Sequence, residues 1–227
     1  MSITPIRLAC LDMAGTTVAD DGLVLAAFSA ALDRLGVEVE TDRARMTKYV
    51  VDTMGESKIT VFRALFPGDE TAAQEGNAAF ESAYSGQIAL TRALPGAVET
   101  FQRLRADGIN IALTTGFSRA TADALLEHLG WRALIDLSLT PGEVGGLGRP
   151  HPDMILAAAA RLADDDPRAV AVAGDTVSDI RSGTASGAAI VAGVLTGAHG
   201  RSALTEAGAT RVLDHVAELP ALIEEHR

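Results

Sequence analysis

The fold is decided near the N-terminus, by the stretch Arg7-Leu8-Ala9-Cys10-Leu11-Asp12-Met13-Ala14-Gly15-Thr16-Thr17-Val18. The apolar run at 8–11 is typical of a buried strand, and it ends in the carboxylate of Asp12. Gly15 permits a sharp turn just beyond that carboxylate. Open parallel α/β sheets place their ligand sites at the carboxyl ends of strands, which is where Asp12 would lie. Taken alone, Asp12 would be better explained as a helix N-cap.

Two later apolar runs, at 109–114 and 169–173, also end in polar residues and glycine. The first is followed by Thr115-Gly116, and the second by Gly174-Asp175-Thr176, with Asp179 one helical turn later. Because the carboxyl ends of neighbouring parallel strands meet at one edge of a sheet, the three strand ends predict one polar crevice. This repetition makes a functional role for Asp12 the better explanation.

From about residue 95 onward, strand and helix patterns alternate along the chain. Such alternation favours a parallel sheet with helices on both faces. We therefore predict an α/β fold with a Rossmann-like, doubly wound parallel sheet. The predicted strands are 8–11, 109–114, 134–137, 169–173, 188–192 and 211–213. The predicted helices are 96–107, 118–129, one that starts at Pro152, 177–186, and one that ends near Glu225.

No strand pattern occurs between about residues 20 and 91, where helices are predicted instead. These helices are 23–35, 41–51, 54–66 and 71–90. The insertion predicts an all-helical cap domain, 20–91, on a core formed by 1–19 and 92–227, with hinges at 20–22 and 92–96. A cap can close over a site, exclude water and add specificity residues. The alternative is a rigid helical layer on the same core.

The composition is that of a globular protein. The 227 residues are 48% hydrophobic and 22% charged, and the net charge is −11. Such a surface repels nucleic acid and anionic membranes, so we expect neither as a partner. No uncharged apolar run reaches the roughly 18 residues of a membrane span, and no signal-peptide pattern begins the sequence. Together with a single cysteine in an apolar strand, Cys10, these features predict a cytoplasmic protein. The sequence is also compatible with a homodimer.

Four motifs, in this order, resemble those of the haloacid dehalogenase superfamily. They are Asp12-Met13-Ala14-Gly15-Thr16, Thr115-Gly116, Arg149 and Gly174-Asp175-Thr176-Val177-Ser178-Asp179. The Asp-x-Ala-Gly-Thr form, with an arginine as the third motif, is similar to the phosphonoacetaldehyde hydrolases (phosphonatases) of this superfamily. The resemblance covers nearly the whole chain. It implies a Mg²⁺-dependent hydrolase whose substrate is a small anionic phosphonate or phosphate.

The resemblance also implies the nucleophile and the metal ligands. Asp12 would attack phosphorus and form an acyl phosphate. Mg²⁺ would be held by Asp12, Asp175 and the backbone carbonyl of Ala14, because hard cations take oxygen ligands. Asp179 would act on the metal through water or orient Asp175. Its alternative is a carboxylate favoured by a helix N-terminus.

The phosphoryl group would be bound by the second and third motifs. The Thr115 hydroxyl and the Gly116 N–H would hold its oxygens, although a threonine at this place would more often cap a helix. The guanidinium of Arg149 would bind phosphoryl oxygens and balance the carboxylates. Three further residues are expected in the substrate site: Gly15, Thr16 and Met54.

Ala14 departs from the wider superfamily. Most of its phosphatases have an aspartate two residues after the nucleophile, which protonates the leaving oxygen and later activates water. This chain has a methyl group there. A carbon leaving group stabilised as an enamine would not need that acid. Ala14 therefore favours cleavage of a carbon–phosphorus bond.

Lys58 is the second residue that favours cleavage of a carbon–phosphorus bond. The segment 54–65 resembles the cap helix that carries the Schiff-base lysine of phosphonatases. Helical spacing places Lys58 in an apolar stripe, which would lower its pKa and favour the free amine. The alternative is a lysine at the edge of the stripe with its amine in solvent. The other lysine, Lys48, is expected to be solvated. The stripe consists of Met54, Lys58, Val61, Phe62 and Leu65.

Two residues differ from the phosphonatase pattern. Met13 stands where phosphonatases have tryptophan, and Val61 stands where they have a histidine near the lysine. The motifs together predict hydrolysis of the carbon–phosphorus bond of phosphonoacetaldehyde, or of a related small phosphonate, through an aspartyl phosphate. One alternative is a phosphatase for small phosphate monoesters on the same core. Another is a non-catalytic relative that binds a phosphorylated ligand.

Overall fold

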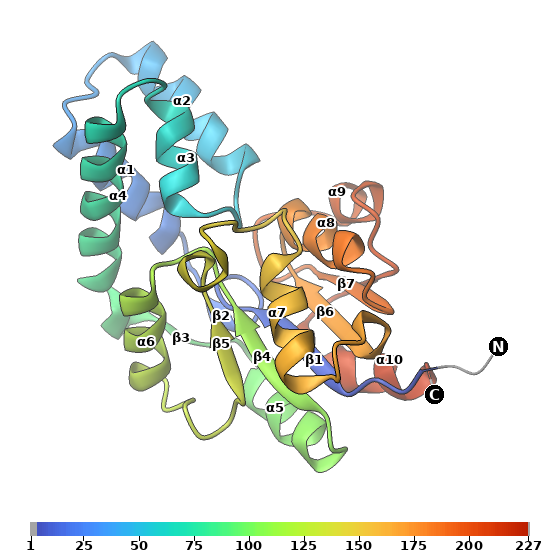
Figure 1. Ribbon diagram of the computed structural model, residues 1–227. Coiled ribbons are helices and arrows are strands. Elements are labelled where there is room, and N and C mark those ends of the chain that lie inside the picture. Colours follow the sequence, from blue (N-terminus) through green and yellow to red (C-terminus); the bar gives the residue numbers. More distant parts are fainter. Residues whose placement is uncertain (1–3, 227) are drawn as a thin grey trace.

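The computed structural model describes residues 4–226. Its centre is a six-stranded parallel sheet with the strand order β5-β4-β1-β6-β7-β8 (Figure 1). The strands are β1 (Leu8–Asp12), β4 (Asn110–Thr114), β5 (Leu137–Leu139), β6 (Val170–Gly174), β7 (Ile190–Val194) and β8 (Arg211–Leu213). Helices cover both faces of the sheet, so the predicted α/β class is confirmed.

The central strand β1 has both faces buried. Leu8 and Cys10 pack in one hydrophobic cluster with α7 (Asp153–Leu162), whereas Ala9 and Leu11 face the opposite cluster. Burial on both sides explains why the strand is an unbroken apolar run rather than an alternating one. The helices on the second face include α5 (Ala97–Ala106), α6 (Arg119–His128) and α10 (Leu219–Glu225). Two further α-helices in the described part of the chain follow strands of this sheet: α8 (Val177–Ser186) and α9 (Arg201–Glu206).

The register of β1 with its neighbours brings their carboxyl ends level. Asp12 lies opposite Thr114 of β4, and Leu11 lies opposite Ala173 of β6. The residues that immediately follow these three strands are therefore neighbours at one edge of the sheet. This is the edge that the polar strand ends predicted.

Four helices inserted after the first strand form a layer of their own beside this edge (Figure 1). They are α1 (Leu23–Arg34), α2 (Glu40–Asp52), α3 (Lys58–Leu65) and α4 (Glu70–Ser85). Their interior is aromatic: the ring centroid of Phe28 lies 5.2 Å from that of Phe62 and 4.6 Å from that of Phe80. A short antiparallel pair, β2 (Val18–Ala19) and β3 (Arg92–Ala93), connects this helical layer to the sheet. The division into a core domain and a cap domain stays a prediction.

Two helices of the helical layer differ from their predicted boundaries. The helix predicted at 54–66 begins only at Lys58, because a turn with Gly55 at φ +88° precedes it. Met54 therefore lies in that turn and not on the helix. The helix predicted at 71–90 ends at Ser85, and a short 3₁₀ helix, η1 (Ile88–Leu90), follows it.

Two strands also lie later in the chain than predicted. The run 134–137 mostly forms a turn whose apolar residues Leu134 and Ile135 pack against the core, and β5 starts at Leu137. The strand predicted at 188–192 is β7, which pairs with β6 from Ile190 onward. The helix α9 and the β2–β3 pair were not predicted. Within residues 4–226, no helix has the length and apolar character needed to cross a bilayer.

Candidate active site

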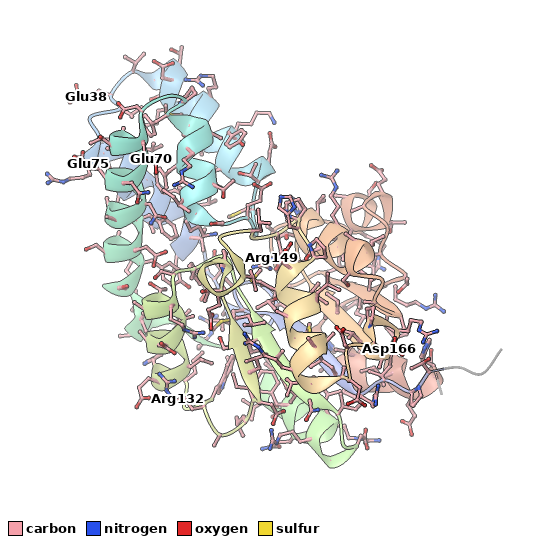
Figure 2. The ribbon with its side chains drawn as sticks, in the orientation of Figure 1. Glu38, Glu70, Glu75, Arg132, Arg149 and Asp166 are labelled. Atoms are coloured by element: carbon pink, nitrogen blue, oxygen red, sulfur yellow. The ribbon has the colours of Figure 1, made fainter. Side chains whose placement is uncertain are left out.

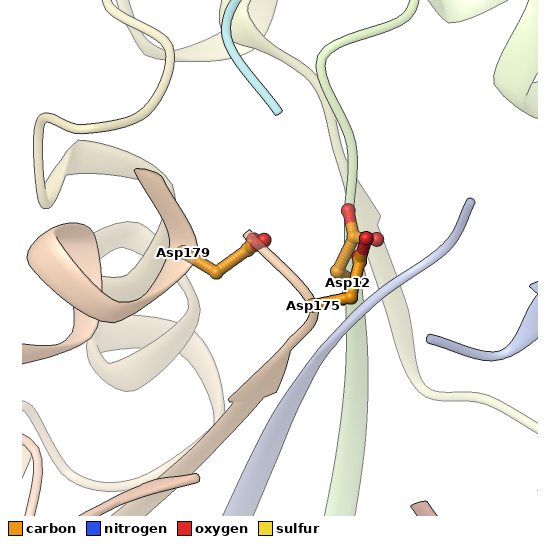
Figure 3. A group of neighbouring side chains, drawn as sticks. All are labelled: Asp12, Asp175 and Asp179. Atoms are coloured by element: carbon orange, nitrogen blue, oxygen red, sulfur yellow. The ribbon is translucent and has the colours of Figure 1, made fainter. Parts of the chain in front are cut away.

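Three aspartates meet at the carboxyl edge of the sheet (Figure 3). Asp12 ends β1, Asp175 follows β6, and Asp179 lies in the first turn of α8. One carboxylate oxygen from each lies within 4.8 Å of the others, and all three residues are buried. Oxygen donors of this kind suit a hard divalent cation. The cluster could therefore hold a metal ion.

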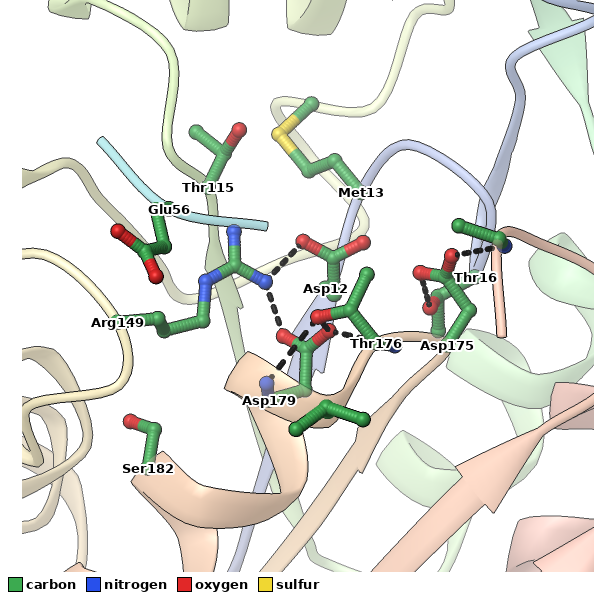
Figure 4. Close-up of polar contacts among 12 residues, drawn as sticks. Asp12, Met13, Thr16, Glu56, Thr115, Arg149, Asp175, Thr176, Asp179 and Ser182 are labelled. Carbon is green, nitrogen blue, oxygen red and sulfur yellow. Dashed lines mark hydrogen bonds and ion pairs between the residues drawn. The ribbon is translucent and has the colours of Figure 1, made fainter. Parts of the chain in front are cut away.

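Arg149 is the cation that pairs with this cluster. Its Nη1 donates to a carboxylate oxygen of Asp12 and to one of Asp179 (Figure 4). Its other terminal nitrogen points toward Thr115 in the same view. The Nε is buried and has no hydrogen-bond partner among residues 4–226. One guanidinium thus pairs with two of the three carboxylates through Nη1, and its other terminal nitrogen is directed away from them toward Thr115.

Burial and the negative charge that Arg149 does not neutralise change the pKa values of the carboxyl groups. Burial raises the pKa of Asp12 to about 6; Arg149 opposes this rise, and the charge of Asp179 adds to it. Burial, followed by the charges of Asp12 and Asp179, also raises the pKa of Asp175 well above its usual value. Buried charges are costly unless they are paired. A divalent cation at these oxygens would favour the ionised carboxylates, so both the donors and the charge balance fit a metal.

Asp175 is held in a cradle that includes the loop after β7, which was not predicted to be part of the site. The Ala198 N–H donates to its carboxylate at 2.8 Å, and the Thr16 hydroxyl donates at 3.1 Å. A Cβ atom on Gly197 would lie 2.0 Å from Asp175 Oδ2, and one on Gly15 would lie 2.5 Å from it. Gly15 also has a φ of +92°, as its predicted turn requires. The only signal for this loop in the sequence is a glycine-containing turn after an apolar strand.

Helix capping at α8 involves Asp179 directly. Its carboxylate accepts the Thr176 N–H at 3.0 Å, and the Thr176 hydroxyl accepts the Asp179 N–H at 3.2 Å. Asp179 is therefore a carboxylate at a helix N-terminus and, at the same time, a partner of Arg149. Its predicted action on a metal stays a prediction.

Thr115 is not a helix cap. The N-cap of α6 is Ser118, whose hydroxyl accepts the Thr121 N–H at 3.2 Å. The Thr115 hydroxyl instead accepts the Phe117 N–H at 3.2 Å. This bond folds the loop after β4 into a tight turn beside Asp12. The commoner role of a threonine at this place, capping the N-terminus of a helix, is therefore excluded for Thr115.

The turn before α3 docks onto two loops of the sheet. A Cβ atom on Gly116 would lie 2.4 Å from the Glu56 carbonyl oxygen, and one on Gly55 would lie 2.4 Å from the Thr176 hydroxyl. The Lys58 N–H donates to the Gly116 carbonyl at 3.4 Å. So close an approach requires glycine at both positions, because any side chain there would collide with the opposite loop. The contacts fix the start of α3 against the loop that carries Thr115.

Lys58 is buried, with an exposed fraction of 6%, which excludes a lysine whose amine reaches bulk solvent. Its Nζ lies 5.3 Å from the ring centroid of Phe117, 5.7 Å from that of Phe80 and 5.9 Å from that of Phe28. Burial, followed by the nearby charge of Arg149, lowers the pKa of Lys58 to about 8. By contrast, Lys48 is exposed and pairs with Asp52.

A cavity of about 410 Å³ lies between the sheet edge and the helical layer. Its wall contains both the nucleophile candidate Asp12 and the amine candidate Lys58. Thr16 and Asp179 do not line the cavity. Thr16 contacts the lining residue Asp175, and Asp179 contacts the lining residue Arg149. The residues predicted for the site that line the cavity are Asp12, Ala14, Gly15, Met54, Lys58, Thr115, Gly116, Arg149 and Asp175.

Comparisons with known proteins identify the family of this chain. Residues 6–187 match the model of the haloacid dehalogenase-like hydrolase family. The chain is 31% identical to the phosphonoacetaldehyde hydrolase of Bacteroides fragilis, with 96% of each chain covered. It is 29% identical to the bifunctional riboflavin kinase/FMN phosphatase of Arabidopsis thaliana, over 80% of this chain and 47% of that protein.

Solved structures show the same fold. A hydrolase from Pseudomonas syringae matches with a TM-score of 0.84 and 24% identity, covering 96% of this chain and 98% of that one. A phosphonoacetaldehyde hydrolase like protein from Oleispira antarctica matches with a TM-score of 0.84 and 23% identity. It covers 99% of this chain and 93% of that one.

Removal of Arg149 should destabilise the metal-free protein. Arg149→Ala leaves the buried carboxylates of Asp12 and Asp179 without their cation, and breaking a buried pair costs about 3–5 kcal/mol of unfolding free energy. The matched control is Arg132→Ala, because Arg132 lies at the surface and pairs there with Glu127 (Figure 2). That change should stay within about 0.5 kcal/mol. Urea unfolding at pH 7 in a chelator measures both variants against the parent. An unfolding midpoint of Arg149→Ala equal to that of Arg132→Ala would contradict the central role of Arg149.

Proposed function

Because the chain belongs to the haloacid dehalogenase-like hydrolases, we propose that it is a magnesium-dependent hydrolase of a carbon–phosphorus bond. The substrate would be phosphonoacetaldehyde or a related small phosphonate. The observation that carries this proposal is the buried amine of Lys58, with a lowered pKa, on the wall of the cavity that also contains Asp12. The relative from Bacteroides fragilis supports the same chemistry.

Asp12 would transfer the phosphoryl group. One of its carboxylate oxygens attacks phosphorus, the bond from carbon to phosphorus breaks, and an aspartyl phosphate forms. Water then attacks this intermediate and releases phosphate and the free carboxylate. The Gly116 N–H, the Thr115 hydroxyl and the free terminal nitrogen of Arg149 would bind the phosphoryl oxygens during both steps.

The metal would be held by Asp12, Asp175 and the backbone carbonyl of Ala14. Mg²⁺ suits oxygen donors and commonly uses only one or two carboxylates. When bound, it would polarise a phosphoryl oxygen and offset negative charge. The Thr16 hydroxyl and the Ala198 N–H would keep Asp175 in place for this purpose.

Lys58 would make the carbon a possible leaving group. Its neutral amine attacks the aldehyde carbon, water leaves, and a protonated imine forms. When the carbon–phosphorus bond breaks, its electron pair moves into this imine and gives an enamine. Protonation of the enamine and hydrolysis of the resulting imine release acetaldehyde and restore the amine. A leaving group of this kind needs no acid at the position of Ala14.

The four helices α1–α4 would serve as a cap. They carry Lys58, whereas the sheet carries Asp12, so an aldehyde phosphonate can meet both groups only when the two parts are in contact. Closure would also exclude water from the imine. The short β2–β3 pair lies at the two crossing points between these parts.

A phosphatase is the second candidate, and the Arabidopsis relative favours it. Val61 supports it too, because this buried side chain offers no imidazole beside Lys58. In a phosphatase the core would work in the same way, and Lys58 would only shape the cavity. A relative that binds a phosphorylated ligand without turning it over would bind in the presence of Mg²⁺ and release no phosphate.

Asp12→Asn should abolish phosphate release. The amide keeps the shape of the side chain but cannot attack phosphorus, so we expect a loss of at least about a thousandfold in kcat. The fold should survive, because the substitution removes one buried negative charge. Asp166→Asn, at a surface ion pair (Figure 2), is the control and should retain activity. Substantial phosphate release by Asp12→Asn would exclude the aspartyl phosphate.

The metal site can be tested by binding as well as by activity. A chelator should stop phosphate release, and added Mg²⁺ should restore it. Mg²⁺ should also raise the Tm of the parent protein, because it binds the folded state. Asp175→Ala should need at least about tenfold more Mg²⁺ for half-maximal activity and should show a smaller rise in Tm. Full activity in the chelator would refute the proposed site.

Lys58 separates carbon–phosphorus cleavage from phosphate-ester hydrolysis. Borohydride added with phosphonoacetaldehyde should reduce the imine, label Lys58 and inactivate the protein. Lys58→Arg should lose cleavage because a guanidinium stays protonated, whereas Lys48→Arg should behave like the parent. Since the pKa of Lys58 is about 8, its amine is protonated below that pH, and cleavage should rise as the pH passes through about 8. Undiminished cleavage by Lys58→Arg would instead leave Lys58 as a cap residue only.

A further inference from the structure

Glu81 joins the helical layer to the sheet domain through a single carboxylate. It lies on α4, whereas its hydrogen-bond donors within residues 4–226 are Ser118, the N-cap of α6, and Thr121 in the first turn of that helix. The Ser118 N–H donates to its Oε1 at 3.2 Å, and the Ser118 hydroxyl donates to its Oε2 at 2.6 Å. The Thr121 hydroxyl also donates to Oε2. One turn further along α4, the Ser85 hydroxyl lies 3.4 Å from the same Thr121 hydroxyl.

The place where Glu81 docks is the end of the proposed phosphoryl-binding loop. Ser118 follows Thr115, Gly116 and Phe117 directly, and it is the N-cap of α6. A carboxylate is favoured there because it faces the positive end of the helix and unsatisfied backbone N–H groups. The contact therefore holds α4 against the loop that carries Thr115.

Glu81 also acts on Lys58. Both residues line a second cavity, of about 430 Å³, between the helical layer and the sheet, and Phe117 and Ser118 line it as well. The charged groups that face Lys58 are Arg149 and Asp12 from the sheet edge, Glu81 from α4, Asp20 from the segment before α1 and Glu56 from the turn before α3. Burial and Arg149 lower the pKa of the Lys58 amine, whereas the carboxylates of Asp12, then Glu81 and then Asp20 raise it.

We propose that Glu81 is a positioning residue that clamps α4 to the N-terminus of α6 and thereby holds the Lys58 amine at the phosphoryl-binding loop. This role rests on the proposed function, because it matters only if one substrate must meet both Lys58 and Asp12. Glu81 does not touch the reacting atoms. Its carboxylate fixes the distance between the two parts of the protein and keeps the amine in a defined electrostatic field.

The first test compares Glu81→Ala with Glu75→Ala. Glu75 lies on the same helix, but its side chain is exposed on the outer side of the helical layer (Figure 2). Glu81→Ala should lower kcat/KM for phosphonoacetaldehyde at least about tenfold, because the clamp is lost. It should change hydrolysis of an aryl phosphate, which does not need the amine, by less than threefold. Glu75→Ala should leave both reactions unchanged.

The second test uses Glu81→Gln, which keeps the length of the side chain and an acceptor oxygen but removes the charge. Without that charge the Lys58 amine should lose its proton more readily, so the rise of cleavage with pH should move to lower pH. A residue that merely filled space would not shift this profile. An unchanged profile in Glu81→Gln would overturn the electrostatic part of the proposal.

Hydrogen exchange tests the clamp independently of the chemistry. The Ser118 amide should exchange faster in Glu81→Ala than in the parent or in Glu75→Ala, because its acceptor is gone. Unchanged exchange, or cleavage by Glu81→Ala within threefold of the parent, would overturn the clamp. If Lys58→Arg kept full cleavage, the proposed function would fail, and the exchange at Ser118 would still decide whether Glu81 holds the two parts together.

Discussion

The contact between the Arg149 guanidinium and two buried carboxylates is the interaction on which the rest of the site depends. The register of β1 with β4 and β6 places Asp12 and Asp175 at neighbouring strand ends, and α8 adds Asp179. Three ionised carboxylates at this spacing would repel one another strongly, because they are buried and water does not screen their charges. Arg149 offsets part of that repulsion through Asp12 and Asp179, whereas the side-chain carboxylate of Asp175 has two neutral donors among the described residues, the Thr16 hydroxyl and the Ala198 N–H. Without a metal, the pKa values of Asp12 and Asp175 are therefore raised. A bound cation would relieve this repulsion, so the site is suited to take one up.

The same burial acts in opposite directions on the two proposed reacting groups. It raises the pKa of the Asp12 carboxyl and lowers that of the Lys58 amine, since in each case the charged form is the one that loses hydration. A nucleophilic carboxylate needs the charged form, so Asp12 requires neighbouring positive charge. A nucleophilic amine needs the neutral form, so Lys58 benefits from aromatic neighbours. The molecule meets these two needs by placing Asp12 on the polar sheet edge and Lys58 at the start of α3, among Phe28, Phe80 and Phe117.

Most of the site could be predicted from the sequence because its residues follow recognisable strands. The strand ends at Asp12, Thr115 and Asp175 were placed correctly, since buried parallel strands are short apolar runs with clear ends. The run 134–137 was misassigned because apolar side chains in a packed turn look like those of a strand. The loop after β7 and the side chain of Glu81 could not be found, because their partners Asp175 and Ser118 are distant in sequence. No local pattern records such a contact.

The geometry of Arg149 bears on how an anionic substrate can enter an acidic site. Both of its ion pairs use Nη1, so its other terminal nitrogen stays directed toward the Thr115 loop, where phosphoryl oxygens would lie (Figure 4). One planar group can therefore face carboxylates on one side and a phosphoryl group on the other, which a lysine could not do. This arrangement leaves the total charge negative, and a bound phosphonate makes it more so. A protein with a net charge of −11 offers no long-range attraction to compensate. Substrate binding should therefore be coupled to the binding of a cation at Asp12 and Asp175, because each would reduce the electrostatic cost of the other.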